Sequence, residues 1–174
     1  PYVKPFDLRD GGVVTAFYKS NPAVSVSETY SKIESIPLTV INASSQESGE
    51  GDASNLVDGD VNTTWHTMYS VTVAQYPHWV DFDAGDVKTI KGFTYLPRQD
   101  GGTNGCIKDY SLQLSIDGEN WGEVVIKGSF PRGNKLQKVM LEKPVKARYI
   151  RFTGLNSQNG ADFAGGAEFT VIAD

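Results

Sequence analysis

Apolar and polar side chains alternate along much of this chain, and no segment longer than a turn or two repeats its apolar residues at helical spacing. Residues 110–116 place an apolar side chain at every second position and end at the turn dipeptide Asp117-Gly118. Val80 and Phe82 alternate with two aspartates in the same way. Since successive side chains of a β-strand point to opposite faces, this alternation is typical of half-buried strands.

The same pattern predicts strands through most of the chain. We expect them at residues 13–18, 80–83, 90–96, 110–116, 124–126, 137–141, 148–153 and 169–172. Turn signals separate these runs at short intervals, and the 18 glycines and 8 prolines are spread along the chain rather than clustered. Many short strands joined by turns are typical of an all-β sandwich or barrel.

Residues 1–35 differ from the rest of the chain. A turn is expected at residues 6–12, followed by the strand at 13–18, and a polar stretch then runs to Glu34 before a new apolar run begins. We therefore place a boundary near residue 35. The leading segment is too short to bury a core by itself, so we interpret it as a linker or as the tail of a preceding small β-domain, with residues 36–174 as the main domain.

Composition argues against several classes of function. A net charge of −5 is the wrong sign for a nucleic-acid partner or for an anionic membrane surface. Cys106 is the only cysteine, so no intrachain disulfide is expected, and we interpret it as a small filler residue. The sequence has no signal peptide and no apolar run long enough for a membrane span, and it begins at Pro1 rather than Met, so we expect a mature fragment or an excised domain.

The tryptophans and histidines have ordinary structural interpretations when taken by residue type alone. Trp65, Trp79 and Trp121 lie in strand-like blocks and are expected in the core. His78 precedes a strand and is expected at the surface or at a sheet edge. His66 follows a tryptophan, and an isolated histidine in that position is more often structural than a binding residue.

Residues 53–67 carry the strongest chemical signal. Asp58, Asp60, Asn62 and Thr63 place hard oxygen donors around a glycine in a short loop, which is the chemistry that a Ca²⁺ site needs. The loop fails the EF-hand pattern, because its sixth position is Thr63 rather than glycine and its twelfth is not glutamate. The residues alone therefore leave two interpretations open, a calcium loop and a plain Asp-Gly turn.

A series of ordered motifs then resembles a known family. LVDGD at 56–60 and TTWHT at 63–67 are followed by HWVDFDAG at 78–85, GFTYLPRQDG at 92–101, IKDY at 107–110, SIDGENW at 115–121, ARYIRF at 147–152 and GAEF at 166–169. In this order they resemble the coagulation factor V/VIII type C, or discoidin-like, domains over residues 36–174. The TWHT and LPRQ motifs are similar to those of family 32 carbohydrate-binding modules within that superfamily.

The resemblance implies an eight-stranded jelly-roll β-sandwich of the galactose-binding type, with one structural Ca²⁺. It implies carboxylate ligands from Asp58 and Glu168, and the hydroxyl and carbonyl oxygens of Thr63. The backbone carbonyls of Asn55, Asp60 and Ala167 would complete the shell. Two segments far apart in the sequence would then be joined by the metal, which would stabilise the fold.

The resemblance also implies a sugar site on loops at one end of the sandwich. His66 and Arg98 match its polar ligand positions, and a guanidinium together with an imidazole suits the neighbouring axial and equatorial hydroxyls of galactose. Asn104 matches a third ligand position, although its loop is one residue longer than the common pattern. Phe163 is the expected aromatic platform, with Tyr69 as a second candidate. A carboxylate from Glu47 or Glu50 completes the expected set.

These expectations describe a non-catalytic module that binds glycans with terminal galactose or N-acetylgalactosamine. The alternatives are an adhesion domain that binds a protein or cell surface through a degenerate sugar site, and a glycosidase, which would need two carboxylates flanking one cleft. Residues 5–18 look similar to the last strands of the small C-terminal β-domain of chitobiases and β-hexosaminidases. That implies the C-terminal part of a bacterial glycoside hydrolase, secreted, periplasmic or at the cell surface, with a catalytic domain preceding this chain. We expect a monomer with neither nucleic-acid nor membrane partners.

Overall fold

A computed structural model describes residues 12–30 and 35–174, and its contacts divide the chain into two units on either side of residue 34. The first unit contributes a hairpin in which β1 (Gly12–Tyr18) pairs antiparallel with β2 (Asn21–Tyr30). The expected strand at 13–18 is present, whereas the expected turn at 6–12 lies almost wholly outside the described residues. The polar stretch that follows contains a strand, because residues 21–30 pair with β1 and Val24 and Val26 alternate with serines.

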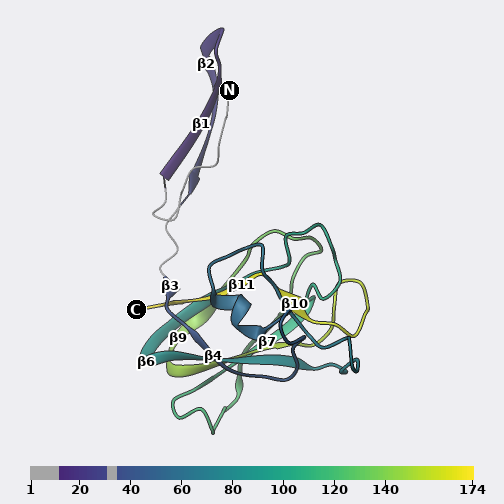
Figure 1. Ribbon diagram of the computed structural model, residues 1–174. Helices are drawn as coiled ribbons and strands as arrows, with labels where there is room; N and C mark the ends of the chain where they lie inside the picture. The colour runs from purple at the N-terminus through teal and green to yellow at the C-terminus, as the bar shows by residue number, and fades with distance from the viewer. Residues whose placement is uncertain (1–11, 31–34) are drawn as a thin grey trace. The chain divides into compact units, whose positions relative to one another are not determined.

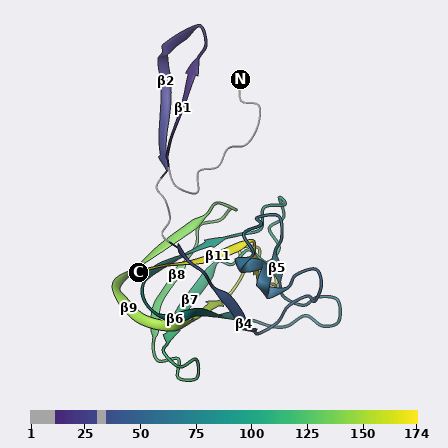
Figure 2. The same cartoon turned by 60° about the vertical axis from the view of Figure 1, so that its left-hand side comes forward.

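The second unit is a β-sandwich, shown in Figures 1 and 2. Its main sheet runs in the order β3-β11-β6-β9-β7-β8, with β4 also paired to β6. The bounds are β3 Ser35–Ile36, β4 Thr39–Ala43, β6 His78–Leu96, β7 Asp109–Ser115, β8 Val124–Ser129, β9 Gln137–Gly154 and β11 Glu168–Ala173. A 3-10 turn η1 (Ala53–Val57) and the short pair β5 (Trp65–His66) and β10 (Gly165–Gly166) complete the unit. No helix in the described ranges is long and apolar enough to cross a bilayer.

Two long strands connect the layers of the sandwich. β6 and β9 pair along their lengths, but their register shifts between Asp83 and Lys88 and again between Ile90 and Gly92. The strands bend at these shifts, so the first half of β6 pairs with β4 and its second half with β11. Gly92 is needed at the second shift, because a Cβ there would lie 2.3 Å from the carbonyl oxygen of Val139. The expected all-β jelly-roll sandwich is therefore confirmed. In the described residues, seven strands pair in the main sheet, and β5 and β10 form a separate two-stranded pair.

Stacked aromatic rings from both layers form the core. Phe82 and Phe169 stack with ring centroids 4.6 Å apart, and Phe152 lies 5.0 Å from Phe169. Phe93 also stacks on Phe169 at 5.5 Å. These rings are fully buried, and they come from β6, β9 and β11, so the aromatic cluster joins the two halves of the bent strands.

Two sequence expectations about buried residues are wrong. Trp65 lies in the core, but Trp79 and Trp121 are only half-buried. Each of these two packs a ring face on the Arg151 guanidinium, whose carbon lies 4.4 Å from the Trp79 ring centroid and 4.2 Å from that of Trp121. His78 is not a surface or edge residue and is 1% exposed. The alternation of β6 explains why His78 is buried and Trp79 is not. Residues 78, 80 and 82 face inward, and Trp79 therefore faces outward.

Candidate functional site

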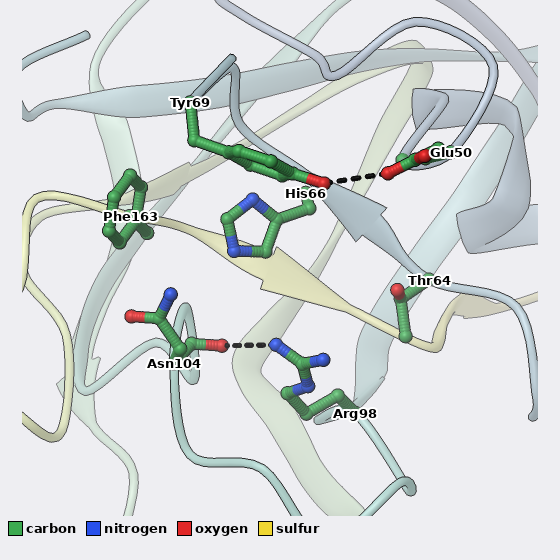
Figure 3. A pocket seen from close by; sticks show the side chains of 8 residues that line it. Glu50, Thr64, His66, Tyr69, Arg98, Asn104 and Phe163 are labelled. Atoms are coloured by element: carbon green, nitrogen blue, oxygen red, sulfur yellow. Dashed lines mark hydrogen bonds between the residues drawn. The ribbon is translucent and has the colours of Figure 1, made fainter. Parts of the chain in front are cut away.

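Loops gather around β5 at one end of the sandwich (Figure 2). Residues of these loops line a hollow of about 470 Å³. It is lined by Glu50, Gly51, Thr64, His66, Tyr69, Arg98, Asn104 and Phe163. Figure 3 shows how the labelled side chains surround the hollow. β5 supplies His66, the loop after β6 supplies Arg98 and Asn104, and the loop before β10 supplies Phe163. The structure thus brings together five of the six predicted sugar-site residues, all except Glu47.

Close backbone packing sets the position of His66. Gly51 lies so near that a Cβ on it would meet the Cβ and the amide nitrogen of His66 at 2.9 Å. On the other side, Gly165 pairs with His66 in the β5–β10 ladder, and a Cβ there would approach the Trp65 carbonyl to 2.4 Å. Only glycine fits at either position, so the imidazole rises from a backbone held on both sides.

The hydrogen bonding of His66 determines what its ring offers to a ligand. Nδ1 lies 2.7 Å from the carbonyl oxygen of Thr67, and because a carbonyl only accepts, Nδ1 carries the proton. In the neutral ring, Nε2 is then an acceptor. Burial lowers the pKa of His66 below its ordinary value of 6.5, which keeps this neutral form at pH 7. His66 therefore presents a hydrogen-bond acceptor.

Arg98 presents donors of fixed direction. Its Nε donates to Asp100 Oδ1 at 2.8 Å, one terminal nitrogen contacts Asp100 Oδ2, and the other donates to the Asn104 carbonyl at 3.2 Å. The hydrogen bonds from Arg98 lower the pKa of Asp100 to about 2, so the pair stays charged. Since a guanidinium has five N–H groups, one remains free on each terminal nitrogen. Arg98 thus keeps donors for a ligand in the hollow that His66 also lines.

Phe163 lies in a loop segment whose backbone carbonyls are held by hydrogen bonds. Five consecutive carbonyl oxygens, those of residues 161–165, each accept a hydrogen bond. The donors, in order, are Ser157 Oγ, His78 Nε2, the Tyr76 hydroxyl, the Thr67 amide and the Tyr95 hydroxyl. The Phe163 ring is half-buried, with its centroid 5.3 Å from that of His66. A loop held in this way presents the ring as a fixed apolar wall.

The acidic residues near the hollow have different positions. Glu47 is 8% exposed, and its carboxylate accepts hydrogen bonds from the backbone of Tyr69 and Ser70 and from the Ser70 hydroxyl. It therefore holds the loop that carries Tyr69 and does not line the hollow. Glu50 does line it, and its Oε2 accepts a hydrogen bond of 2.7 Å from the Tyr69 hydroxyl.

The predicted calcium residues lie together at the start of β11. Asp58 Oδ2 accepts a hydrogen bond from the Thr63 hydroxyl at 2.7 Å, and Asp60 turns its carboxylate to Asn62. Glu168 Oε1 is buried and has no hydrogen-bond partner. Burial and the negative charge of Asp58 raise the pKa of Glu168 to about 7. An orphaned carboxylate oxygen beside another carboxylate is an environment that a cation would relieve.

The other two predicted ligands, Asn55 and Ala167, flank this group. Asn55 lies in η1 and donates its side-chain amide to the Thr64 carbonyl at 3.0 Å, and Ala167 is fully buried next to Glu168. Within the described residues, no three acidic, histidine or cysteine side chains converge into a metal site by themselves. Any cation held here would therefore depend on two carboxylates combined with hydroxyl and carbonyl oxygens, a hard-oxygen set of the kind that suits Ca²⁺.

Comparison with known proteins identifies the family. Residues 40–169 match the model of the F5/8 type C domain. The chain belongs to the F5/8 type C domain family. It is 32% identical to a sialidase of Micromonospora viridifaciens over 155 residues, which are 87% of this chain and 24% of the sialidase. The chain spans about a quarter or less of the length of the curated relatives it matches.

Solved structures place this F5/8 type C domain among carbohydrate-binding modules of family 32. One from Clostridium perfringens, solved in complex with GalNAc-β-1,3-galactose, has a TM-score of 0.72 and 32% identity over 80% of this chain and 99% of that one. The C-terminal domain of a Bacteroides fragilis chitobiase has a TM-score of 0.70 and 26% identity over 81% of this chain and 96% of that one. The resemblance inferred from the sequence motifs is confirmed.

The sequence analysis missed the residues that support the site from behind. Tyr76 and His78 hold the carbonyls of Phe163 and Asp162, and Thr67 bonds Ala164 through both its amide and its hydroxyl. Burial lowers the pKa of His78, so it too stays neutral at pH 7. The one available signal was that His78 occupies an inward position of the alternating strand.

Proposed function

We propose that this F5/8 type C domain is a carbohydrate-binding module for glycans ending in galactose or N-acetylgalactosamine. The observation that carries the proposal is the convergence of the His66 acceptor, the Arg98 donors and the Phe163 ring on one hollow. The relative that contains GalNAc-β-1,3-galactose has the same fold at 32% identity, which supports this class of ligand.

The arrangement suits one face of a pyranose. Two neighbouring hydroxyls can accept from the free N–H groups of Arg98 and donate to Nε2 of His66, while the Asn104 amide reaches a third polar group. The C–H face of the sugar then packs on Phe163. A few polar contacts and one ring support weak binding, with a Kd of about 0.1–1 mM or about −4 to −5.5 kcal/mol.

We further propose that the module serves a bacterial glycoside hydrolase without cleaving glycans itself. Its curated relatives are much longer and include a sialidase and a lacto-N-biosidase, which supports a position beside a catalytic domain at the cell surface or outside the cell. No bond cleavage at the hollow is required, because a module that holds the attached enzyme near its substrate raises the local concentration of that substrate. Weak binding at each site is sufficient for this role.

We also propose one structural Ca²⁺, held by the carboxylates of Asp58 and Glu168, by Thr63 and by carbonyls of Asn55, Asp60 and Ala167. The buried, unpartnered oxygen of Glu168 supports it, since an unpaired buried carboxylate is costly. The ion would supply positive charge that allows Glu168 to ionise. The loop at 58–63 would thereby be joined to β11, and the base of the sugar site would be stabilised.

Isothermal titration with galactose, N-acetylgalactosamine and glucose tests the binding proposal. We expect saturable binding of the first two sugars, with a loss of at least tenfold in Arg98→Ala and His66→Ala, while Lys127→Ala, on β8 and outside the hollow, binds as the parent does. If none of these sugars or their disaccharides binds, the module is not a galactose binder. An adhesion role would then be the hypothesis to test.

A further inference from the structure

We propose that Glu50 makes this hollow selective for charge, so that it prefers a sugar bearing a free ammonium group to a neutral one and disfavours a sugar carboxylate. The inference rests on the proposed sugar-binding function and adds the class of substituent that the site accepts. It follows from the charges around the hollow and from the position of one carboxylate oxygen.

The positive charge of the hollow is already matched. Arg98 is the one cation among its lining residues, and Asp100 pairs with it through both carboxylate oxygens. The terminal nitrogens keep free N–H groups for hydroxyls, but the net charge of the pair is zero. A sugar carboxylate at the remaining N–H groups would meet a guanidinium whose charge Asp100 already offsets, so it would gain little charge attraction.

The remaining ionisable groups add negative charge only. His66 contributes none, because its ring is neutral at pH 7 as shown above. Glu47 lies directly behind the Tyr69 loop, and its hydrogen bonds from Ser70 and Tyr69 lower its pKa, so it is ionised. With Glu50 at the rim, the hollow and its immediate wall carry two unmatched carboxylates.

Glu50 is placed to contact a ligand. One oxygen, Oε2, accepts from the Tyr69 hydroxyl at 2.7 Å, and the Tyr69 ring lies edge-on to His66 with centroids 5.2 Å apart. The tyrosine thus links the carboxylate to the ring that would hold the sugar. Figure 3 shows Glu50 beside the Tyr69 hydroxyl, on the side of the hollow away from Phe163. An ammonium group at that side would have three donors to offer to this carboxylate.

The expected size of the effect is modest because Glu50 is exposed. Ion pairs at exposed positions are screened by water and salt, so a preference of about two- to fivefold for the ammonium form is expected at low ionic strength. It should shrink as salt is added. Binding of neutral sugars, which depends on the hydrogen bonds to His66 and Arg98, should vary little with salt.

The test compares galactose, galactosamine, N-acetylgalactosamine and galacturonic acid by titration at pH 7 in 20 mM and 500 mM NaCl. We expect galactosamine to bind about two- to fivefold more tightly than galactose at low salt, and galacturonic acid more weakly than galactose. In Glu50→Gln the ratio of the galactosamine to the galactose affinity should fall to about one. Glu123→Gln is the matched control, because it removes the same charge from an exposed position outside the hollow and should leave the ratio unchanged.

The outcomes separate this inference from the proposed function. If galactose and N-acetylgalactosamine bind but the galactosamine ratio is one in the parent, the charge selectivity is wrong and the sugar site stands. The same conclusion follows if Glu50→Gln and Glu123→Gln change the ratio equally, because the effect is then one of overall charge. If no sugar binds at all, the proposed function itself fails.

Discussion

Replacing Phe163 with alanine tests whether the ring is the platform for the sugar. The ring is half-buried beside His66, while its backbone carbonyl is held by Tyr76. Because each carbonyl from residue 161 to 165 is bonded independently of the Phe163 side chain, the loop should keep its shape when the ring is removed. The change therefore removes one wall of the hollow and little else.

The magnitude follows from the apolar surface that the ring covers. A pyranose that packs its C–H face on the ring removes about 40–60 Å² of apolar surface from water, which at roughly 25 cal/mol per Å² is about 1–1.5 kcal/mol. The sugar Kd should therefore rise about 5- to 13-fold in Phe163→Ala. Phe163→Tyr keeps the ring, so its Kd should stay within about twofold of the parent value, on the same area argument.

Titration of both variants with galactose, followed by NMR, measures the effect, and thermal unfolding checks the fold. Amide shifts of His66 and of residues 97–106 report whether the ligand still enters the hollow. A Kd for Phe163→Ala equal to that of the parent, with an unchanged melting temperature, would refute the platform. Loss of both binding and stability would show that the ring belongs to the core instead.

Three further predictions concern the metal, the outer face and pH. By calorimetry, the protein in EDTA should have a free energy of unfolding about 2.7 kcal/mol lower than the protein in Ca²⁺ at 100 times its Kd. Glu168→Gln should abolish that difference, and equal responses of parent and variant would contradict the site. Arg151→Met should lower the free energy of unfolding by about 3 kcal/mol, because it leaves the buried Asp81 carboxylate unpaired; urea unfolding followed by tryptophan emission measures this. The double variant with Asp81→Asn should recover most of the loss. The pKa of His66 is lowered from 6.5, so the contribution of its neutral ring to stability is complete above pH 6.5 and is lost as the pH falls below that value. Galactose affinity, measured by titration, should be flat from pH 6.5 to 8.5 and weaken at lower pH. A steady rise in affinity toward pH 5 would contradict the acceptor role of His66.

The sequence was most informative where one short segment determined the structure. Alternation located most of the strands, although not β2. Arg98 lies on the loop that follows β6, and His66 lies on the short strand β5. These residues meet in one hollow because β5 and the end of β6 reach the same end of the sandwich. The family pattern supplied the pairing of distant segments, which periodicity alone does not contain.

The remaining features depend on which face a strand turns inward, and on contacts between distant loops. Glu47 and Glu50 were equivalent in the sequence, yet one is buried under the Tyr69 loop and the other lines the hollow. Trp79 was assigned to the core by residue type, whereas in the structure it stacks on Arg151 on the outer face. Such pairings between residues far apart in the chain are set by the register of β6 against β9, which no local pattern reveals.

The hydrogen bonds behind the hollow bear on the proposed sugar binding, because they hold its loops in place before any ligand arrives. A weak ligand cannot also provide the free energy to order a loop, since each immobilised side chain costs about 0.5–1.5 kcal/mol on binding. Here the ordering is done by folding, because the carbonyls of residues 161–165 are bonded to donors such as Tyr76, His78 and Tyr95, which do not line the hollow. His66 is likewise held by glycines on both sides and Arg98 by Asp100. If the module binds a sugar as proposed, its limited contact energy is available for affinity, because these supporting residues have already ordered the loops.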